Sequence, residues 1–385
     1  MTTVELRHEP VVNSATGADR SHKPKYVLLA PWTVKAGAGV NSVILGLQEA
    51  MRQDCESAIV ITDWNPPSLP GQSWVRCRLP HLPLTNLLGF LLFFLPTTWR
   101  LNKVLRGAAV VNPHYPGPAL LPLVLLRRIG SLRKLIVSVH GSDVVYATRA
   151  SRLEKALYRM IFASADAVVA CSQSLCRDVQ SVSPEAKTIC VPNGIPKPPD
   201  KLGVRPIPGA YLVSVAAFTE NKGHAVLIDA FLQVSKTYPD LKLVLIGGDG
   251  PNRKVIQAKV AELGLADRVR LLVNVPHDDV WSWIGHAECF VHAAWREAFG
   301  IAILEAGLLE TPVVATAVDG VAEYLISGVN SLTCEPGKDK QMASAILDVL
   351  GDRLSAERRA RKLHQTATQY TWERAWEKYK LAAGL

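Results

Sequence analysis

The sequence lacks the features of several protein classes. Its 385 residues contain no apolar run of the roughly 20 residues that a membrane-spanning helix needs. Residues 1 to about 23 are polar and aperiodic, with no apolar run suited to a secretory signal. No repeat at a solenoid period, zinc-finger spacing or aromatic RNA-binding motif is present. We therefore expect a cytoplasmic protein with a disordered tail at 1–24 and no nucleic acid partner.

Cysteines are few and irregularly spaced. The seven cysteines include no CxxC pair and no His/Cys cluster at metal-ligand spacing. An odd set of this kind is typical of buried thiols in a reducing compartment and not of a disulfide framework. The sequence therefore predicts no metal site.

Acidic residues are too few in the first half of the chain to balance the basic ones. Residues 1–200 hold 22 Lys and Arg against 13 Asp and Glu, whereas residues 201–385 hold 21 of each. The whole formal charge of +9 therefore lies in the first half. A one-sided positive field favours an anionic partner, such as a membrane surface or a phosphorylated acceptor.

Short apolar runs alternate with helical patterns from Lys25 onwards, as in parallel sheets covered by helices. Six prolines between Pro192 and Pro208 cannot continue a helix or a central strand and indicate a linker. We expect two Rossmann-like α/β domains, 25–198 and 199–370, facing a cleft at the carboxyl ends of their strands. The runs predict strands at Tyr26–Ala30, Ser57–Thr62, Ala108–Val111, Lys134–Val139, Ala167–Ala170, Thr188–Val191, Tyr211–Ala216, Leu241–Ile246, Val269–Val273, Cys289–His292 and Pro312–Thr316.

The segment 84–106 combines apolar and basic residues. No charged residue occurs between His81 and Thr98, and Trp99, Arg100 and Lys103 follow. This mixture suits a helix that lies in the headgroup region of an anionic membrane. A buried core helix with a solvated basic flank explains the pattern equally well.

Two loops of the first domain follow predicted strands. Gly37 and Gly39 open a helix, where glycines let a ligand approach the backbone and free N–H groups attract an anion. His140 comes directly after the strand at Lys134–Val139, where its ring can hydrogen-bond a sugar hydroxyl. A plain strand-to-helix turn and a histidine in a capped turn are the alternatives.

The second domain carries a lysine and two carboxylates in comparable positions. Lys222 lies in the loop after the first strand, where an ammonium group can neutralise a diphosphate. Glu297 and Glu305 bracket Gly300 and an apolar run, which puts the first in a loop and the second on a helix. On spacing alone, a solvated lysine and two unrelated glutamates would explain these residues.

Taken in order, these motifs resemble the retaining GT-B glycosyltransferases of family 4, from about residue 25 to the C-terminus. The terminal residues 371–385 are similar to the family's last helix, which packs back onto the first domain. The motifs are His140-Gly-x-Asp143, Pro192-Asn193-Gly194, Lys222-Gly223, Gly248-Asp249-Gly250-Pro251, Glu297-x7-Glu305 and Pro312-Val-Val-Ala315.

The resemblance implies a nucleotide-diphosphate sugar bound mainly by the second domain and an acceptor bound mainly by the first, with no metal or other cofactor. It implies that Lys222 contacts the diphosphate and Glu305 the ribose. Catalytic positions implied near the donor sugar are Glu297 and His140. The backbone of Phe299, Gly300 and Ile301, and the loop of Gly37 and Gly39, are implied to bind the donor.

One departure concerns the diphosphate. Ala217 stands where the family usually has an arginine, so the second cation expected there is missing. The expected activity is transfer of a hexose to a saccharide acceptor, lipid-linked or soluble, in surface polysaccharide biosynthesis at the inner face of the cytoplasmic membrane. The alternative is a non-catalytic nucleotide-sugar-binding or membrane-associated protein with the same fold.

Overall fold

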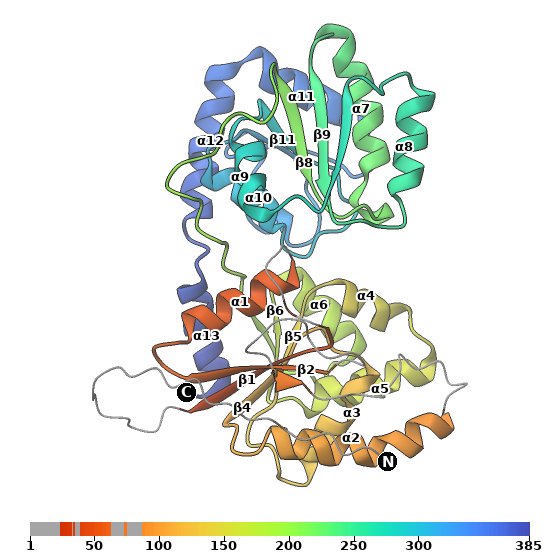
Figure 1. Ribbon diagram of the computed structural model, residues 1–385, viewed down its shortest axis with the longest axis vertical. Coiled ribbons are helices and arrows are strands. Elements are labelled where there is room, and N and C mark those ends of the chain that lie inside the picture. Colours follow the sequence, from red (N-terminus) through yellow and green to blue (C-terminus); the bar gives the residue numbers. More distant parts are fainter. Residues whose placement is uncertain (1–23, 33, 35–38, 63–72, 75–86) are drawn as a thin grey trace, which may run out of the picture.

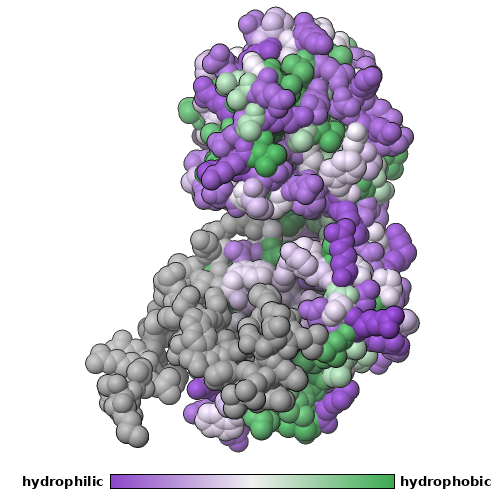
Figure 2. All heavy atoms as spheres, turned by 90° about the vertical axis from the view of Figure 1, so that its right-hand side faces the viewer, coloured by the Kyte–Doolittle hydropathy of each residue, from purple (hydrophilic) through white to green (hydrophobic). Residues whose placement is uncertain are grey.

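The computed structural model describes residues 24–32, 34, 39–62, 73–74 and 87–385, with side chains placed from residue 94 onwards in the last range. The predictions for the tail, for Gly37 and for 84–86 therefore lie outside the described residues. The chain forms two α/β domains stacked along the long axis (Figure 1). A space-filling view shows them as two lobes (Figure 2).

The N-terminal domain is built on parallel strands in the order β3-β2-β1-β4, followed by β5-β6-β7. Parallel bridges from Val111 to Leu135 and from His114 to Ser138 join the two groups. This is the doubly wound order of a Rossmann-like domain. The strands are β1 (Lys25–Ala30), β2 (Glu56–Ile61), β3 (Ser73–Trp74), β4 (Val110–Pro113), β5 (Ile136–Val139), β6 (Ala167–Ala170) and β7 (Thr188–Cys190).

Helices cover both faces of this sheet because its strands are apolar on both sides. Tyr26 and Leu28 of β1 face α1, whereas Val27 and Leu29 face the layer that contains α2, α3 and α5 (Figure 1). The helices are α1 (Val40–Ala50), α2 (Leu87–Val104), α3 (Leu121–Arg128), α4 (Ser142–Arg149), α5 (Arg152–Ser164) and α6 (Gln173–Val182), with a 3-10 turn η2 (Pro118–Leu120).

The C-terminal domain repeats the plan with a single parallel sheet, β10-β9-β8-β11-β12-β13. Its strands are β8 (Tyr211–Val215), β9 (Lys242–Gly247), β10 (Val269–Val273), β11 (Cys289–His292), β12 (Val313–Thr316) and β13 (Leu332–Cys334). Its helices are α7 (His224–Thr237), α8 (Arg253–Glu262), α9 (His277–Gly285), α10 (Ile301–Leu308), α11 (Asp339–Gly351) and α12 (Arg353–Ala367), with 3-10 turns η3 (Glu220–Lys222) and η4 (Val321–Glu323).

The last helix, α13 (Trp372–Ala383), leaves the C-terminal domain and packs against α1 of the N-terminal domain (Figure 1). Thr371 caps its first turn by accepting from the amide of Arg374. The indole Nε1 of Trp376 donates to Asp54 at 2.7 Å, and the Tyr379 hydroxyl lies 2.9 Å from Ser138 Oγ. Buried polar contacts of this kind fix the docking of an otherwise apolar helix face.

Helix α2 realises part of each interpretation of the 84–106 segment. In its described C-terminal part, Thr98 and Leu101 are buried against the domain. Leu95 and Trp99 are 66% and 65% exposed, and the Lys103 ammonium lies over the Trp99 ring. The helix is therefore amphipathic, with one face in the core and an aromatic, basic face outside. Among the described residues, no helix combines the length and apolarity needed to cross a bilayer.

We expect Gly46→Ala to loosen the docking of α13. A Cβ atom at Gly46 would lie 2.2 Å from the Trp372 ring. Alanine is a better helix former by about 1 kcal/mol, so α1 alone would gain. Overpacking should instead lower the free energy of unfolding by about 1–3 kcal/mol in urea titrations.

Gly351→Ala is the matched control, because nothing lies within 4 Å of a Cβ atom there, at the end of α11. It should retain the parent's stability. A Gly46→Ala protein as stable as this control would contradict the packing of Trp372 against α1.

Candidate active site

The loops after β8 and β11 meet at the carboxyl edge of the C-terminal sheet. The amide of Trp295 donates to the carbonyl of Asn221 at 2.8 Å. Gly223 has a φ of 65°, and a Cβ atom there would lie 1.9 Å from the carbonyl oxygen of Ala293. Only glycine permits both this conformation and this approach. The sequence Lys222-Gly223 thus brings the lysine beside the loop of Glu297.

Glu297 sits at the centre of this edge. Its Oε2 accepts from Lys222 Nζ at 2.7 Å and lies 3.0 Å from His292 Nε2. The side chains of Lys222 and Glu297 are only 20% and 15% exposed. Burial alone would raise the pKa of Glu297, but the charge of Lys222 and the hydrogen bonds outweigh it and hold the pKa well below its usual value. Glu297 is therefore a firmly ionised group.

Glu305 is buried on α10, one turn beyond the apolar residues that precede it. Its Oε1 lies 2.8 Å from Nε2 of His277, the first residue of α9. This hydrogen bond raises the pKa of His277. Oε2 has no hydrogen-bond partner among the described residues, so one oxygen is positioned and the other is open to a ligand.

Residues 299–301 present backbone rather than side chains. Gly300 starts α10 with a φ of 79°, and the Tyr324 hydroxyl donates to the carbonyl of Phe299 at 2.8 Å. The Phe299 ring is buried against Tyr324 and Tyr370. The first amides of a helix have no partner within it, so the amide of Ile301 and its successor point outward from the N-terminus of α10.

His140 lies at the carboxyl end of β5 and pairs with a second histidine. Its Nε2 is 3.1 Å from Nδ1 of His114, and the two rings stack. Burial lowers the pKa of His140 to about 3 and, together with His140, lowers that of His114 well below its usual value. Asp143 accepts from the amides of His140, Gly141 and Val144. The loop is thus fixed around a neutral imidazole pair.

Contacts across the domains bring the His140 loop to the Glu297 loop. A Cβ atom at Gly141 would lie 2.9 Å from Cβ of Ala298, and Cys171 Sγ lies 3.7 Å from the Ala298 carbonyl. Gly37 lies outside the described residues. Gly39 begins α1 with a φ of 72° and open space beside it.

Two polar contacts tie the domains together beside this site. The Glu323 carboxylate accepts from the amides of Gln173 and Ser174 at 3.0 and 2.8 Å. These amides open α6, where a negative charge is favoured by the helix dipole. Arg296 donates to Asp178 of α6 at 2.5 Å and to Asp319 at 3.1 Å.

The sequence interpretation missed several residues of this arrangement, namely His114, His277, His292 and Arg296. His292 ends a strand that the sequence does predict, which is the one signal that would have found it. Each of the others depends on a partner from another element. Within the described residues, no group of three or more His, Cys, Asp and Glu side chains is arranged to hold a metal ion.

Comparison with known families follows the two domains. Residues 37–197 match the family model described as Glycosyltransferase Family 4, and residues 205–369 match the model described as Glycosyl transferases group 1. Together the two matches cover both domains. The chain belongs to the group 1 glycosyltransferases of family 4 and is a sugar-transferring enzyme.

Relatives of known activity agree with this assignment. The chain is 28% identical over 291 residues to the GDP-mannose-dependent alpha-(1-6)-phosphatidylinositol monomannoside mannosyltransferase of Mycolicibacterium smegmatis, covering 69% of this chain and 73% of that one. It is 31% identical over 170 residues to one chain of the human phosphatidylinositol N-acetylglucosaminyltransferase, covering 43% of this chain and 34% of that one. The match thus spans about a third of the human protein's length.

Solved structures show the same fold. Anabaena HepE, solved with UDP and glucose, superposes with a TM-score of 0.76 at 19% identity, covering 94% of this chain and 100% of that one. Sucrose-phosphate synthase of Thermosynechococcus elongatus gives a TM-score of 0.76 at 20% identity, covering 93% and 98%. The expected GT-B fold with two Rossmann-like domains is thereby confirmed.

We expect the buried pair of His114 and His140 to make stability depend on pH. A histidine whose folded pKa lies below its unfolded value of about 6.5 stabilises the folded state above pH 6.5, and this contribution is lost as pH falls. In His114→Asn, the loss of unfolding free energy between pH 7.5 and pH 5 should be smaller than in the parent by about 2 kcal/mol. Urea titrations at the two pH values measure it, and equal losses would mean that His114 is charged when folded.

Proposed function

We propose that this glycosyltransferase moves a hexose, with retention of anomeric configuration, from a nucleotide-diphosphate sugar to a saccharide acceptor. The observation that carries the proposal is the buried pair of Lys222 and Glu297 beside the N-terminus of α10. A helix N-terminus and an ammonium group together form a site for a diphosphate. Both belong to the C-terminal domain, so the donor binds there.

The charge of the departing diphosphate falls on few groups in this chain. Ala217, which replaces the family's usual arginine, is exposed at the same edge of the sheet. Arg296 is no substitute, because its guanidinium group is held by Asp178 and Asp319. Lys222 and the amides that open α10 therefore stabilise the leaving group, without a metal ion in the proposed mechanism.

Glu305 is proposed to hold the ribose. One carboxylate oxygen contacts His277, which fixes the rotamer. The second oxygen is left to accept hydrogen bonds from the two ribose hydroxyls. His277 thereby positions Glu305 without itself touching the donor.

Glu297 is proposed to act through its charge and not as a base. Its pKa lies well below the usual range because Lys222 and His292 outweigh the effect of burial, so it has little affinity for an acceptor proton. Its negative charge faces the sugar as positive charge develops at the anomeric carbon. We propose same-face attack, in which the leaving diphosphate takes the acceptor's proton and the protein supplies positioning. His140 contributes a neutral ring on the opposite side.

The N-terminal domain is proposed to receive a lipid-linked saccharide of a surface polysaccharide pathway. The formal charge of +9 lies in this half of the chain. The exposed Leu95 and Trp99 stand beside Arg100 and Lys103 on α2, which suits peripheral contact with an anionic bilayer. The mycobacterial relative is named for a phosphatidylinositol mannoside acceptor, which supports a lipid-linked class.

A panel of UDP-, GDP-, ADP- and dTDP-sugars tests the donor site by thermal denaturation. A ligand that binds only the folded protein raises the melting temperature with occupancy. We expect a rise of a few degrees with one base, and we expect Lys222→Ala and Glu305→Ala to abolish it. Lys236→Ala, an exposed lysine of α7, is the control and should keep the shift. A panel without any rise would overturn the proposed donor site.

Glu297→Gln tests the role of the buried charge. The amide keeps the size of the side chain but loses the charge that holds Lys222 and faces the sugar. We expect kcat/KM to fall about 100-fold, as for the loss of a transition-state contact in other enzymes. Glu288→Gln, which breaks an exposed ion pair with Arg205 in the same domain, should leave it unchanged.

The same assay reports the stereochemistry by NMR of the first-formed product. Turnover of Glu297→Gln within threefold of the parent would remove Glu297 from the mechanism. An inverted anomeric centre would reject retention.

A further inference from the structure

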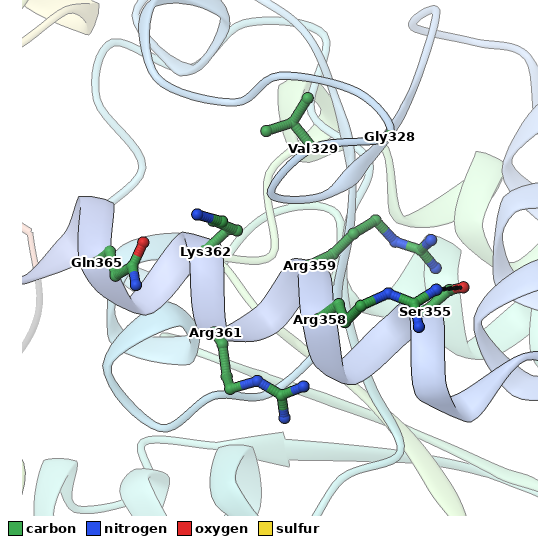
Figure 3. A pocket seen from close by; sticks show the side chains of 8 residues that line it. All are labelled: Gly328, Val329, Ser355, Arg358, Arg359, Arg361, Lys362 and Gln365. Atoms are coloured by element: carbon green, nitrogen blue, oxygen red, sulfur yellow. Dashed lines mark hydrogen bonds between the residues drawn. The ribbon is translucent and has the colours of Figure 1, made fainter.

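A basic cavity lies on α12, apart from the residues of the active site. It has a volume of about 450 Å³. Figure 3 shows Arg359 and Lys362 rising from the helix toward the loop of Gly328 and Val329, which comes before β13. Because this loop lies at the amino end of a parallel strand, the cavity is at the opposite edge of the sheet from Lys222. The lining residues are Gly328, Val329, Ser355, Arg358, Arg359, Arg361, Lys362 and Gln365.

The four cations of this cavity are poorly neutralised. They occur within five consecutive positions of one helix, where like charges repel one another. Glu357 approaches Arg361 only at 4.0 Å and also pairs with Arg353. Arg358 donates to the hydroxyl of Ser355, a neutral acceptor. The lining contains no carboxylate.

Arg359 is the residue that most requires a partner. Its Nη2 is buried and makes no hydrogen bond in the described part of the chain. A buried donor without an acceptor is destabilising, and buried charged donors more so. In folded proteins such groups usually have a partner, which here must come from outside the chain.

A second hollow of about 380 Å³ adjoins the first and shares Ser355 and Arg359 with it. Two carboxylates, Asp348 and Asp352, line this second hollow. Asp352 is engaged at the start of α12, where it accepts from the amide of Ser355 at 3.0 Å. Neither aspartate forms an ion pair with Arg359 within 4.0 Å among the described residues. The acidic groups thus border the basic cavity without filling it.

We propose that this cavity binds a phosphorylated anion, either a free phosphate ester or diphosphate or the phosphate of a lipid headgroup. Guanidinium groups match phosphate oxygens in pairs, and Arg358, Arg359 and Lys362 supply donors from one side. The Ser355 hydroxyl adds a neutral donor. The volume accommodates two phosphoryl groups. This site is separate from the donor site and does not depend on the proposed function.

Inorganic diphosphate is the probe, and calorimetric titration of the full chain measures its binding. Because the donor site also attracts diphosphate, the titrations use Lys222→Ala as the background. We expect binding to persist in that background and to weaken at least tenfold when Arg359→Gln is added. Arg353→Gln removes the same charge from an exposed position of α12 outside the cavity and should change the affinity less than twofold.

A stability measurement guards against misfolding of the variant. Removal of an unpaired buried cation should leave the melting temperature of Arg359→Gln equal to or above the parent's in the absence of phosphate. Diphosphate should raise the melting temperature of the Lys222→Ala protein and not that of the double variant. If diphosphate binds the double variant within twofold of the background, the proposal is overturned.

Vesicles distinguish the two sources of the phosphate. Flotation with phosphatidylcholine vesicles is compared with flotation when about a fifth of the lipid is phosphatidylglycerol, a fraction chosen for surface charge. Loss of anionic-vesicle binding in Arg359→Gln supports a lipid headgroup. Unchanged vesicle binding with loss of diphosphate binding supports a soluble phosphorylated ligand. No change in either measurement rejects the site.

Discussion

The active site is organised by the buried carboxylate of Glu297. An ionised carboxylate is costly to bury unless cations and hydrogen bonds surround it, and Lys222 and His292 do so here. These partners come from the ends of β8 and β11, so satisfying one charge draws two loops together. Gly223 allows the close approach of the loops. The ammonium group is therefore in place at the edge of the sheet before a diphosphate arrives, which is the preorganisation that charge stabilisation requires.

The N-terminal domain is tied to the same loop. Ala298, next to Glu297, touches Gly141 and the thiol of Cys171, and Glu323 is bound by the first amides of α6. A shift of one domain against the other would break these contacts together. The position of the His140 loop relative to the donor site thus depends on short-range polar contacts as well as on the crossing helix α13. The neutral state of His140, with a pKa of about 3, limits it to a hydrogen-bonding role.

Local patterns were enough to predict most of the fold, because the central strands are apolar runs bounded by polar loops. Ala167–Ala170, Val269–Val273 and Cys289–His292 have the predicted bounds, while other ends differ by a few residues. The strands β3 and β13 were missed because two or three residues carry no periodic signal. The partners of the site were harder to predict: His277 meets Glu305, and His114 meets His140, across more than twenty residues. Such pairings are set by how the elements pack and not by sequence spacing.

The donor site and the cavity on α12 handle positive charge in opposite ways. At the donor site the cation of Lys222 is already paired with Glu297, so a bound diphosphate adds to an existing balance of charge. On α12 the Arg359 guanidinium has a buried nitrogen without an acceptor among the described residues, and three further cations share its cavity. Paired charge suits a reaction site, where the lysine must be held in one geometry through the whole cycle. Unpaired charge suits a site whose stability depends on occupancy, because binding of the anion removes a destabilising feature of the empty protein.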